Sequence, residues 1–150
     1  MNLVIIDYGA GNIQSLKFAL KRLGYEAVLS SEADIIQKAD KVVFPGVGEA
    51  SSAMKKLRET GLHNLIPELA QPVLGICLGM QLMCNGSEEG NTKGLGIFDV
   101  DVIRFSEDIK VPQMGWNVVS NLKSPLFVDV VENEHVYMVH SYFAGLCDDT

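Results

Sequence analysis

The sequence predicts an α/β fold, a doubly wound and mostly parallel sheet with added antiparallel strands in its second half. Up to residue 76, short apolar runs alternate with segments whose apolar residues recur at helical spacing. Glycine-rich turns follow the first, third and fourth apolar runs, as expected at the carboxyl ends of parallel strands. From Leu95 onward the pattern changes to apolar runs and turns, which indicates strands without intervening helices.

The expected elements can be placed along the chain from these patterns. Parallel strands are expected at residues 3–6, 27–29, 41–44 and 73–76. Helices are expected at residues 13–23, 32–38, 50–57 and 62–70, and a further one from 78 to a stop at 86. Strands of the second half are expected at residues 100–105, 118–119, 127–131 and 136–143.

Composition narrows the possible partners and compartments. The net charge is −7 and no run of Lys or Arg occurs, so a nucleic-acid or anionic-membrane surface is not expected. No apolar stretch is long enough to span a bilayer, and the N-terminus has no charged segment of signal-peptide type. The odd number of cysteines, with no metal-ligand spacing, favours a reducing cytoplasm over a disulfide scaffold.

Residues 75–79, which we call the elbow, organise the sequence. Cys77 lies where a short buried strand runs directly into a helix, with Gly75 two residues before it and Gly79 two residues after it. This is the glycine-flanked nucleophile turn with cysteine in the place of serine. Backbone N–H groups at the start of the helix, beginning with Leu78, favour the thiolate and can bind a developing oxyanion. The alternative is a buried core cysteine between two packing glycines.

A second glycine turn follows the strand at residues 41–44. Pro45-Gly46-Val47-Gly48 can turn a backbone N–H toward a neighbouring site and supply a second oxyanion donor. An ordinary connection between strand and helix explains the same glycines. The turn after the first strand, Gly9-Ala10-Gly11, lacks the third glycine of a dinucleotide-binding fingerprint, which favours a tight turn or an interface role there.

Candidate partners of the thiol are fewer. Gln81 lies one helical turn past Cys77, so its amide can reach a ligand held at the thiol, although it can equally be an ordinary polar helix residue. Cys84 is expected in the core. Among the histidines His63, His135 and His140, only His140 lies on a strand of buried character, which makes it the simplest choice of general base.

Five segments together carry a resemblance to a known family. They are Asp7-Tyr8-Gly9-Ala10-Gly11-Asn12-Ile13, Pro45-Gly46-Val47-Gly48, the stretch from Gly75 to Gln81, Pro112-Gln113-Met114-Gly115-Trp116-Asn117 and His140-Ser141-Tyr142. With them the sequence resembles the class I glutamine amidotransferases from residue 3 to about residue 144. The Met-Gly-Trp-Asn segment further resembles family members that work with a (β/α)8-barrel cyclase.

The resemblance implies a reaction, a partner and roles for several residues. Cys77 would attack the side-chain amide of glutamine, and ammonia would pass to the cyclase; no cofactor or metal is implied. The implied roles are oxyanion donation by Leu78 and the turn of Gly46, Val47 and Gly48, glutamine binding by Gln81, Glu89, Ser141 and Tyr142, and partner contact by Asn12, Met114 and Trp116.

One departure from the family limits the expected activity. The family's catalytic His and Glu lie in a His-x-Glu segment, which these 150 residues do not contain, and His140 matches the substrate strand instead. We therefore expect residues 1–150 to form a single amidotransferase domain, incomplete at its C-terminus and inactive as a glutaminase. The alternatives are a class I glutaminase that serves a different synthase, and a non-catalytic glutamine-binding module of flavodoxin-like fold.

Overall fold

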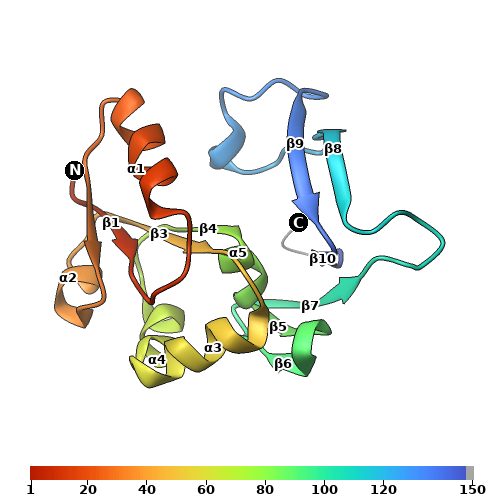
Figure 1. Cartoon of the computed structure of the whole chain (residues 1–150). Coiled ribbons are helices and arrows are strands. Elements are labelled where there is room, and N and C mark those ends of the chain that lie inside the picture. The colour runs from red at the N-terminus through yellow and green to blue at the C-terminus, as the bar shows by residue number, and fades with distance from the viewer. Residues whose placement is uncertain (148–150) are drawn as a thin grey trace.

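A parallel sheet forms the centre of the structure, a computed structural model that describes residues 1–147. Its strands are β1 (Leu3–Ile6), β2 (Ala27–Ser30), β3 (Lys41–Gly46) and β4 (Val73–Cys77), in the order β2-β1-β3-β4 (Figure 1). The chain runs outward from β1 to β2 and then crosses back to β3, so the doubly wound prediction is confirmed. A topological switch point consequently lies between β1 and β3, at whose carboxyl ends ligands bind in such folds.

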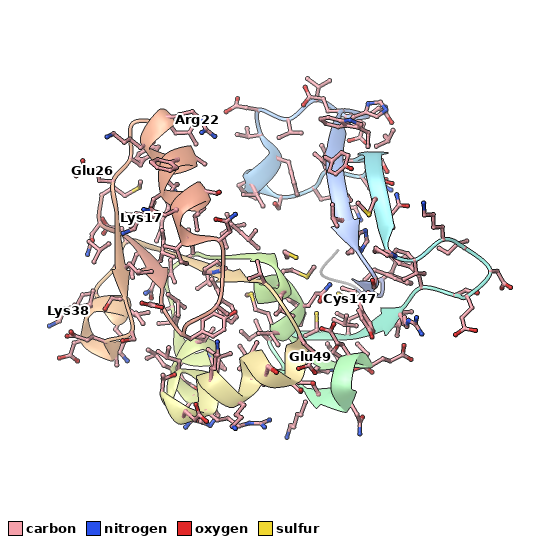
Figure 2. The ribbon with its side chains drawn as sticks, in the orientation of Figure 1. Lys17, Arg22, Glu26, Lys38, Glu49 and Cys147 are labelled. Atoms are coloured by element: carbon pink, nitrogen blue, oxygen red, sulfur yellow. The ribbon has the colours of Figure 1, made fainter. Side chains whose placement is uncertain are left out.

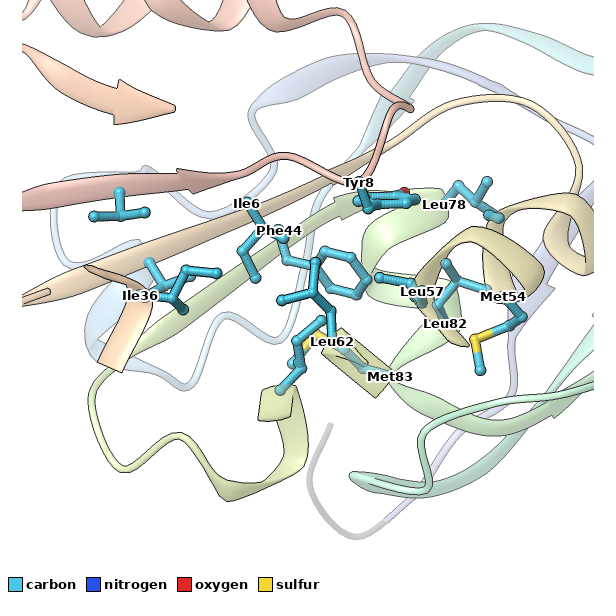
Figure 3. Packing of buried hydrophobic residues seen from close by; sticks show 14 of the residues in the cluster. Ile6, Tyr8, Ile36, Phe44, Met54, Leu57, Leu62, Leu78, Leu82 and Met83 are labelled. Atoms are coloured by element: carbon cyan, nitrogen blue, oxygen red, sulfur yellow. The ribbon is translucent and has the colours of Figure 1, made fainter. Parts of the chain in front are cut away.

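Helices cover both faces of this sheet, with α1 on one side and α3 and α4 on the other (Figure 1). Because side chains alternate along a strand, Leu3, Ile5 and Val43 pack toward α1 (Ile13–Arg22). The opposite faces of β1 and β3 pack against the larger core, whose helices are α2 (Ala33–Gln37), α3 (Ala50–Glu59), α4 (Leu62–Leu65), followed by the 3₁₀ turn η1 (Ile66–Glu68), and α5 (Leu78–Leu82). Figure 3 shows this core around the fully buried Phe44.

The second half of the chain builds two further sheets. A mixed sheet has the order β10-β7-β5-β6, with β5 (Cys84–Ser87), β6 (Thr92–Lys93), β7 (Phe98–Arg104) and β10 (Tyr142–Ala144). The 3₁₀ turn η2 (Glu89–Asn91) connects β5 to β6. Strands β8 (Gln113–Val118) and β9 (His135–His140) pair antiparallel as a sheet of their own, which lies to one side of the central sheet (Figure 1). The expected antiparallel additions are therefore confirmed.

The helix expected over residues 78–86 is wrong beyond Leu82. The carbonyl oxygens of Leu82 and Cys84 accept hydrogen bonds from the N–H groups of Leu95 (2.8 Å) and Gly96 (3.0 Å), 12 to 13 residues later. Gly94 allows this approach, because a Cβ there would collide with the Cys84 carbonyl. These long-range contacts take the backbone out of the helix and into β5. Cys84 is nevertheless fully buried, as expected.

Three strand assignments of the second half also need correction. Residues 127–131 form no strand, because the 3₁₀ turn η3 (Pro125–Phe127) leads into a turn in which the Val130 N–H bonds the Phe127 carbonyl at 2.9 Å. The expected strand 136–143 breaks at Ser141, whose carbonyl accepts from Phe105, so that β9 and β10 belong to different sheets. The expected strand at 118–119 is the end of β8, which also carries Met114 and Trp116, two residues expected in a turn.

No helix within residues 1–147 is both long enough and apolar enough to cross a membrane.

Candidate active site

Cys77 lies at the corner between β4 and α5 in a strained conformation. Its φ of 54° and ψ of −118° are unusual for a residue with a side chain, and such strain concentrates at functional sites. The residue is exposed, whereas Cys84 is buried, so the alternative of a core cysteine at position 77 is wrong. The strained nucleophile corner predicted from the glycine spacing is confirmed as geometry.

Glycines allow α5 to begin so close to the strands. A Cβ on Gly75 would lie 2.7 Å from the Cα of Met80, and one on Gly46 would lie 2.5 Å from the backbone nitrogen of Gly79. A Cβ on Gly79 would overlap the carbonyl oxygen of Phe44. Real Cβ atoms do not approach this closely, so the first turn of α5 packs on β3 and β4 only because these positions lack side chains.

The residues 46–48, which we call the 46–48 turn, lie beside Cys77. Gly46 is the register partner of Cys77 across the β3–β4 pair, and Gly48 has a φ of +96°. Val47 is half exposed at the tip of the turn. The structure thus brings the turn and the N–H of Leu78 together around the thiol, as an oxyanion site requires. That these groups stabilise an oxyanion stays a prediction.

Gln81 and the strand residues meet at one carbonyl. The Gln81 side-chain amide is buried and donates to the Tyr142 carbonyl oxygen at 3.2 Å. His140 Nδ1 donates to the same oxygen at 2.8 Å, and its ring packs edge-on against Phe105 with centroids 5.0 Å apart. The hydrogen bond to Tyr142 occupies one ring nitrogen of His140. The contact joins α5 to β10, and thereby brings three of the expected substrate residues, Gln81, Ser141 and Tyr142, to one side of the elbow.

Glu89, the fourth expected substrate residue, lies on the other side of the 46–48 turn. Its Oε2 accepts from the N–H of Ala50 at 2.9 Å, at the beginning of α3. Glu49, labelled in Figure 2, caps the same helix end by accepting from the backbone N–H groups of Ser51 and Ser52. Hydrogen bonds from these serines, the Ser51 side chain foremost, lower the pKa of Glu49 to about 2.

Tyr8 belongs to this region and was not predicted as a site residue. It is buried, and its hydroxyl donates to the Pro45 carbonyl oxygen at 2.9 Å. Burial, and then the negative charge of Cys77, raises the pKa of Tyr8 to about 12. The sequence held one signal for it, since Tyr8 directly follows β1 and β1 pairs with the strand that ends in the 46–48 turn.

The expected partner residues lie on separate surfaces. Met114 and Trp116 are exposed on β8, and Trp116 packs edge-on against Tyr137 of β9 with centroids 5.5 Å apart. Asn12 is exposed at the start of α1, where its side-chain oxygen accepts from the Ser15 N–H at 3.3 Å.

A large groove lies away from the elbow. It encloses about 600 Å³ and is lined by residues that include Leu3, Lys41 and Leu74, which come from the beginnings of β1, β3 and β4. The elbow lies at the opposite edge of the sheet, so this groove is no substrate pocket for Cys77. Within residues 1–147, no cluster of His, Cys, Asp and Glu side chains could hold a metal ion.

Comparisons with known proteins agree with this geometry. The family model "Glutamine amidotransferase class-I" matches residues 4–146. The imidazole glycerol phosphate synthase subunit HisH of Bacteroides fragilis is 56% identical over 153 aligned residues, which are 100% of this chain and 78% of that relative. HisH of Haemophilus influenzae is 48% identical over 144 residues, 95% of this chain and 72% of the relative.

Solved structures show the same fold. A crystal structure of a glutamine amidotransferase superposes with a TM-score of 0.71 at 21% identity, covering 93% of this chain and 71% of that chain. A putative GMP synthase protein from Thermoplasma acidophilum superposes with a TM-score of 0.69 at 20% identity, covering 99% and 69%. From its match over residues 4–146 and its similarity to HisH proteins along its whole length, the chain belongs to the class I glutamine amidotransferases.

Proposed function

We propose that the chain is the glutaminase subunit of an imidazole glycerol phosphate synthase, which releases ammonia from glutamine for histidine biosynthesis. The observation that carries the proposal is the exposed, strained Cys77, which lies opposite Gly46 and directly before Leu78. The HisH names of its relatives support the synthase, since proteins 56% and 48% identical to this chain carry that name.

In the proposed reaction the Cys77 thiolate attacks the side-chain amide carbon of glutamine. A sulfur–carbon bond forms, and the amide oxygen becomes an oxyanion that accepts hydrogen bonds from the Leu78 N–H and the 46–48 turn. The carbon–nitrogen bond then breaks, and the departing nitrogen takes up a proton to leave as ammonia. Water adds to the resulting thioester and releases glutamate and the thiol.

Glutamine would lie between the two groups that flank the elbow. Glu89 presents a carboxylate, which favours the α-ammonium group of an amino acid, beside the N–H of Ala50. On the other side the Gln81 amide and the Ser141-Tyr142 backbone form a polar wall, held together at the Tyr142 carbonyl. These contacts support a role in substrate binding for Glu89, Gln81, Ser141 and Tyr142.

The proton transfers are the step for which this chain offers least. His63 lies on α4, at the end of α3 distant from Glu49, and His135 is exposed opposite Val118 at the end of β9. His140 holds the Tyr142 carbonyl. General acid–base assistance is commonly worth about 100- to 10,000-fold in rate. We therefore propose that the 150-residue chain does not turn over glutamine at a useful rate, even with its cyclase.

A glutamate-release assay tests this proposal with the 150-residue chain, the cyclase and a Cys77→Ala control. The expected result is release no faster than in the control, together with stoichiometric alkylation of Cys77. Sustained turnover that disappears in His140→Ala would contradict the proposal and make His140 the general base.

The β8–β9 face, defined by Met114, Trp116, Val118, Tyr137 and Val139, is the proposed docking surface for the cyclase. All five side chains are exposed, and the strand register places them on one side of the sheet. An apolar surface of this kind usually marks an interaction site. Asn12, at the start of α1, is proposed as a second contact.

Replacing Trp116 tests the docking surface. Aromatic anchors of interfaces typically contribute about 2 kcal/mol or more, so Trp116→Ala should weaken the complex with the cyclase by about 30-fold. Val128→Ala, at a side chain that is 82% exposed but outside this face, is the matched control. Isothermal titration calorimetry measures both, and an unchanged dissociation constant for Trp116→Ala would argue against the assignment. Co-purification with a different synthase would favour the other class I glutaminases instead.

A further inference from the structure

The loop after β1 holds Pro45 by two contacts. The Tyr8 hydroxyl donates to the Pro45 carbonyl oxygen at 2.9 Å, and Tyr8 is only 4% exposed. Gly11, at a φ of +121°, lies against the ring, since a Cβ there would be 3.2 Å from the Cβ and Cγ of Pro45. One contact acts on the carbonyl of Pro45 and the other on its side chain, so the loop restrains this residue from two directions.

The Tyr8 side chain is itself held in place. Its ring packs against Phe44 at a tilt of 57° with centroids 5.5 Å apart, as Figure 3 shows. The next residue, Gly9, offers its carbonyl to the Lys56 ammonium of α3 at 2.6 Å and its N–H to Asp7 at 3.1 Å. The hydroxyl therefore points at the Pro45 oxygen from a fixed support, rather than from a side chain free to turn away.

The restraint on Pro45 reaches the reacting groups through one peptide plane. The Pro45 carbonyl and the Gly46 N–H belong to the same planar unit, so fixing the oxygen fixes the direction in which the chain enters the 46–48 turn. Gly46 and Gly48 have no side chains that would otherwise limit the backbone there. Gly46 is the register partner of Cys77.

From these contacts we propose that Tyr8 is a positioning residue for the 46–48 turn: its hydroxyl holds the Pro45 carbonyl and so keeps the turn's N–H groups aimed at the oxyanion formed on Cys77. The inference rests on the proposed function, because it assigns Tyr8 a part in oxyanion stabilisation. Tyr8 does not touch the substrate in this proposal and acts only through Pro45.

The electrostatics of Tyr8 suit this task. Burial, followed by the charge of Cys77, raises the pKa of its hydroxyl to about 12, so the group stays a protonated donor at neutral pH. A deprotonated tyrosine could not donate, and its charge would oppose the thiolate. The same influence of Cys77 indicates that the hydroxyl and the nucleophile lie within electrostatic reach of each other.

Two reactions of Cys77 separate positioning from general damage. The γ-(4-nitrophenyl) ester of glutamate acylates the thiolate through a tetrahedral oxyanion, and 4-nitrophenolate leaves as an anion that needs no proton from the protein. A sulfur–carbon bond forms, the carbon–oxygen bond breaks, and one nitrophenolate per chain appears as a coloured burst. Iodoacetamide alkylates the same sulfur by displacing iodide, and no oxyanion forms. Only the first reaction depends on the 46–48 turn.

Tyr8→Phe removes the hydroxyl and keeps the ring. The expected result is a burst rate constant about tenfold lower, part of the roughly 100- to 1,000-fold that loss of a whole oxyanion donor costs. The alkylation rate should stay within about twofold. Tyr25→Phe, at a tyrosine that is 47% exposed on the far side of α1, is the matched control and should leave both rates unchanged. Amide hydrogen exchange should quicken at residues 46–48 in Tyr8→Phe and stay slow at Ile5 and Val43 of the core.

The outcomes distinguish the two proposals. A wild-type chain without a Cys77-dependent burst would overturn the proposed function, and the role of Tyr8 with it. A wild-type burst that Tyr8→Phe leaves unchanged, or a fall shared equally by burst and alkylation, would overturn the role of Tyr8 alone. Should Tyr8→Phe not fold, Gly11→Ala carries the test, because it keeps the hydroxyl and displaces the Pro45 ring; it must slow the burst selectively if the inference is correct.

Discussion

Gly79→Ala tests whether close packing at the elbow holds the site together. The added Cβ would overlap the Phe44 carbonyl oxygen and lie 2.9 Å from the Phe44 carbonyl carbon and 3.1 Å from that of Pro45. These are backbone atoms of β3, which cannot rotate away as a flexible side chain would. Either α5 moves off the sheet or β3 bends, and both disturb the 46–48 turn.

The size of the effect follows from two opposing contributions. Overpacking a core costs about 1–3 kcal/mol and occasionally more, and a collision with backbone belongs at the upper end, about 4 kcal/mol. Alanine is favoured over glycine inside a helix by about 1 kcal/mol, which leaves a net loss of about 3 kcal/mol. For a chain of this length that corresponds to a melting temperature roughly 6–12 °C lower.

Thermal and urea unfolding, followed by circular dichroism, measure this loss. Gly24→Ala is the matched control, because Gly24 has open space around it and only its left-handed φ of +82° opposes a side chain. That strain should cost about 1 kcal/mol. The packing argument fails if Gly79→Ala is no more destabilising than Gly24→Ala.

Two further predictions concern titratable side chains. The pKa of Glu49 is lowered to about 2, so its contribution to stability is present above the ordinary carboxyl pKa of 4.5 and is lost as the pH falls toward 2. Glu49→Gln should therefore flatten the fall in melting temperature between pH 5 and about pH 3; an unchanged slope would refute the link. Burial chiefly raises the pKa of Cys84 to about 11, so at about pH 8 iodoacetamide should label Cys77 in the folded chain and Cys84 only after unfolding, as peptide mapping can show. Labelling of both thiols at equal rates would contradict this expectation.

The sequence by itself determined the elements whose causes are local. Apolar runs such as residues 3–6 have one stable arrangement between covering helices, and they form strands where expected. The glycines around Cys77 are needed by a sharp strand-to-helix corner wherever it occurs, so the nucleophile was predictable from their spacing alone. The same holds for α3, whose apolar side chains recur at helical spacing behind a capping carboxylate.

Only the tertiary structure decided the features that depend on segments far apart in the chain. Residues 84–87 continue a helical pattern, yet they pair with β6 and β7, and those pairings outweigh the weak local preference. The break at Ser141 follows from its bond to Phe105, 36 residues earlier, which no periodicity reveals. The hydrogen bond of Tyr8 to Pro45 likewise spans 37 residues. Local chemistry determines which residues can react, whereas the partners that position them are set by strand order and register, which are properties of the folded chain as a whole.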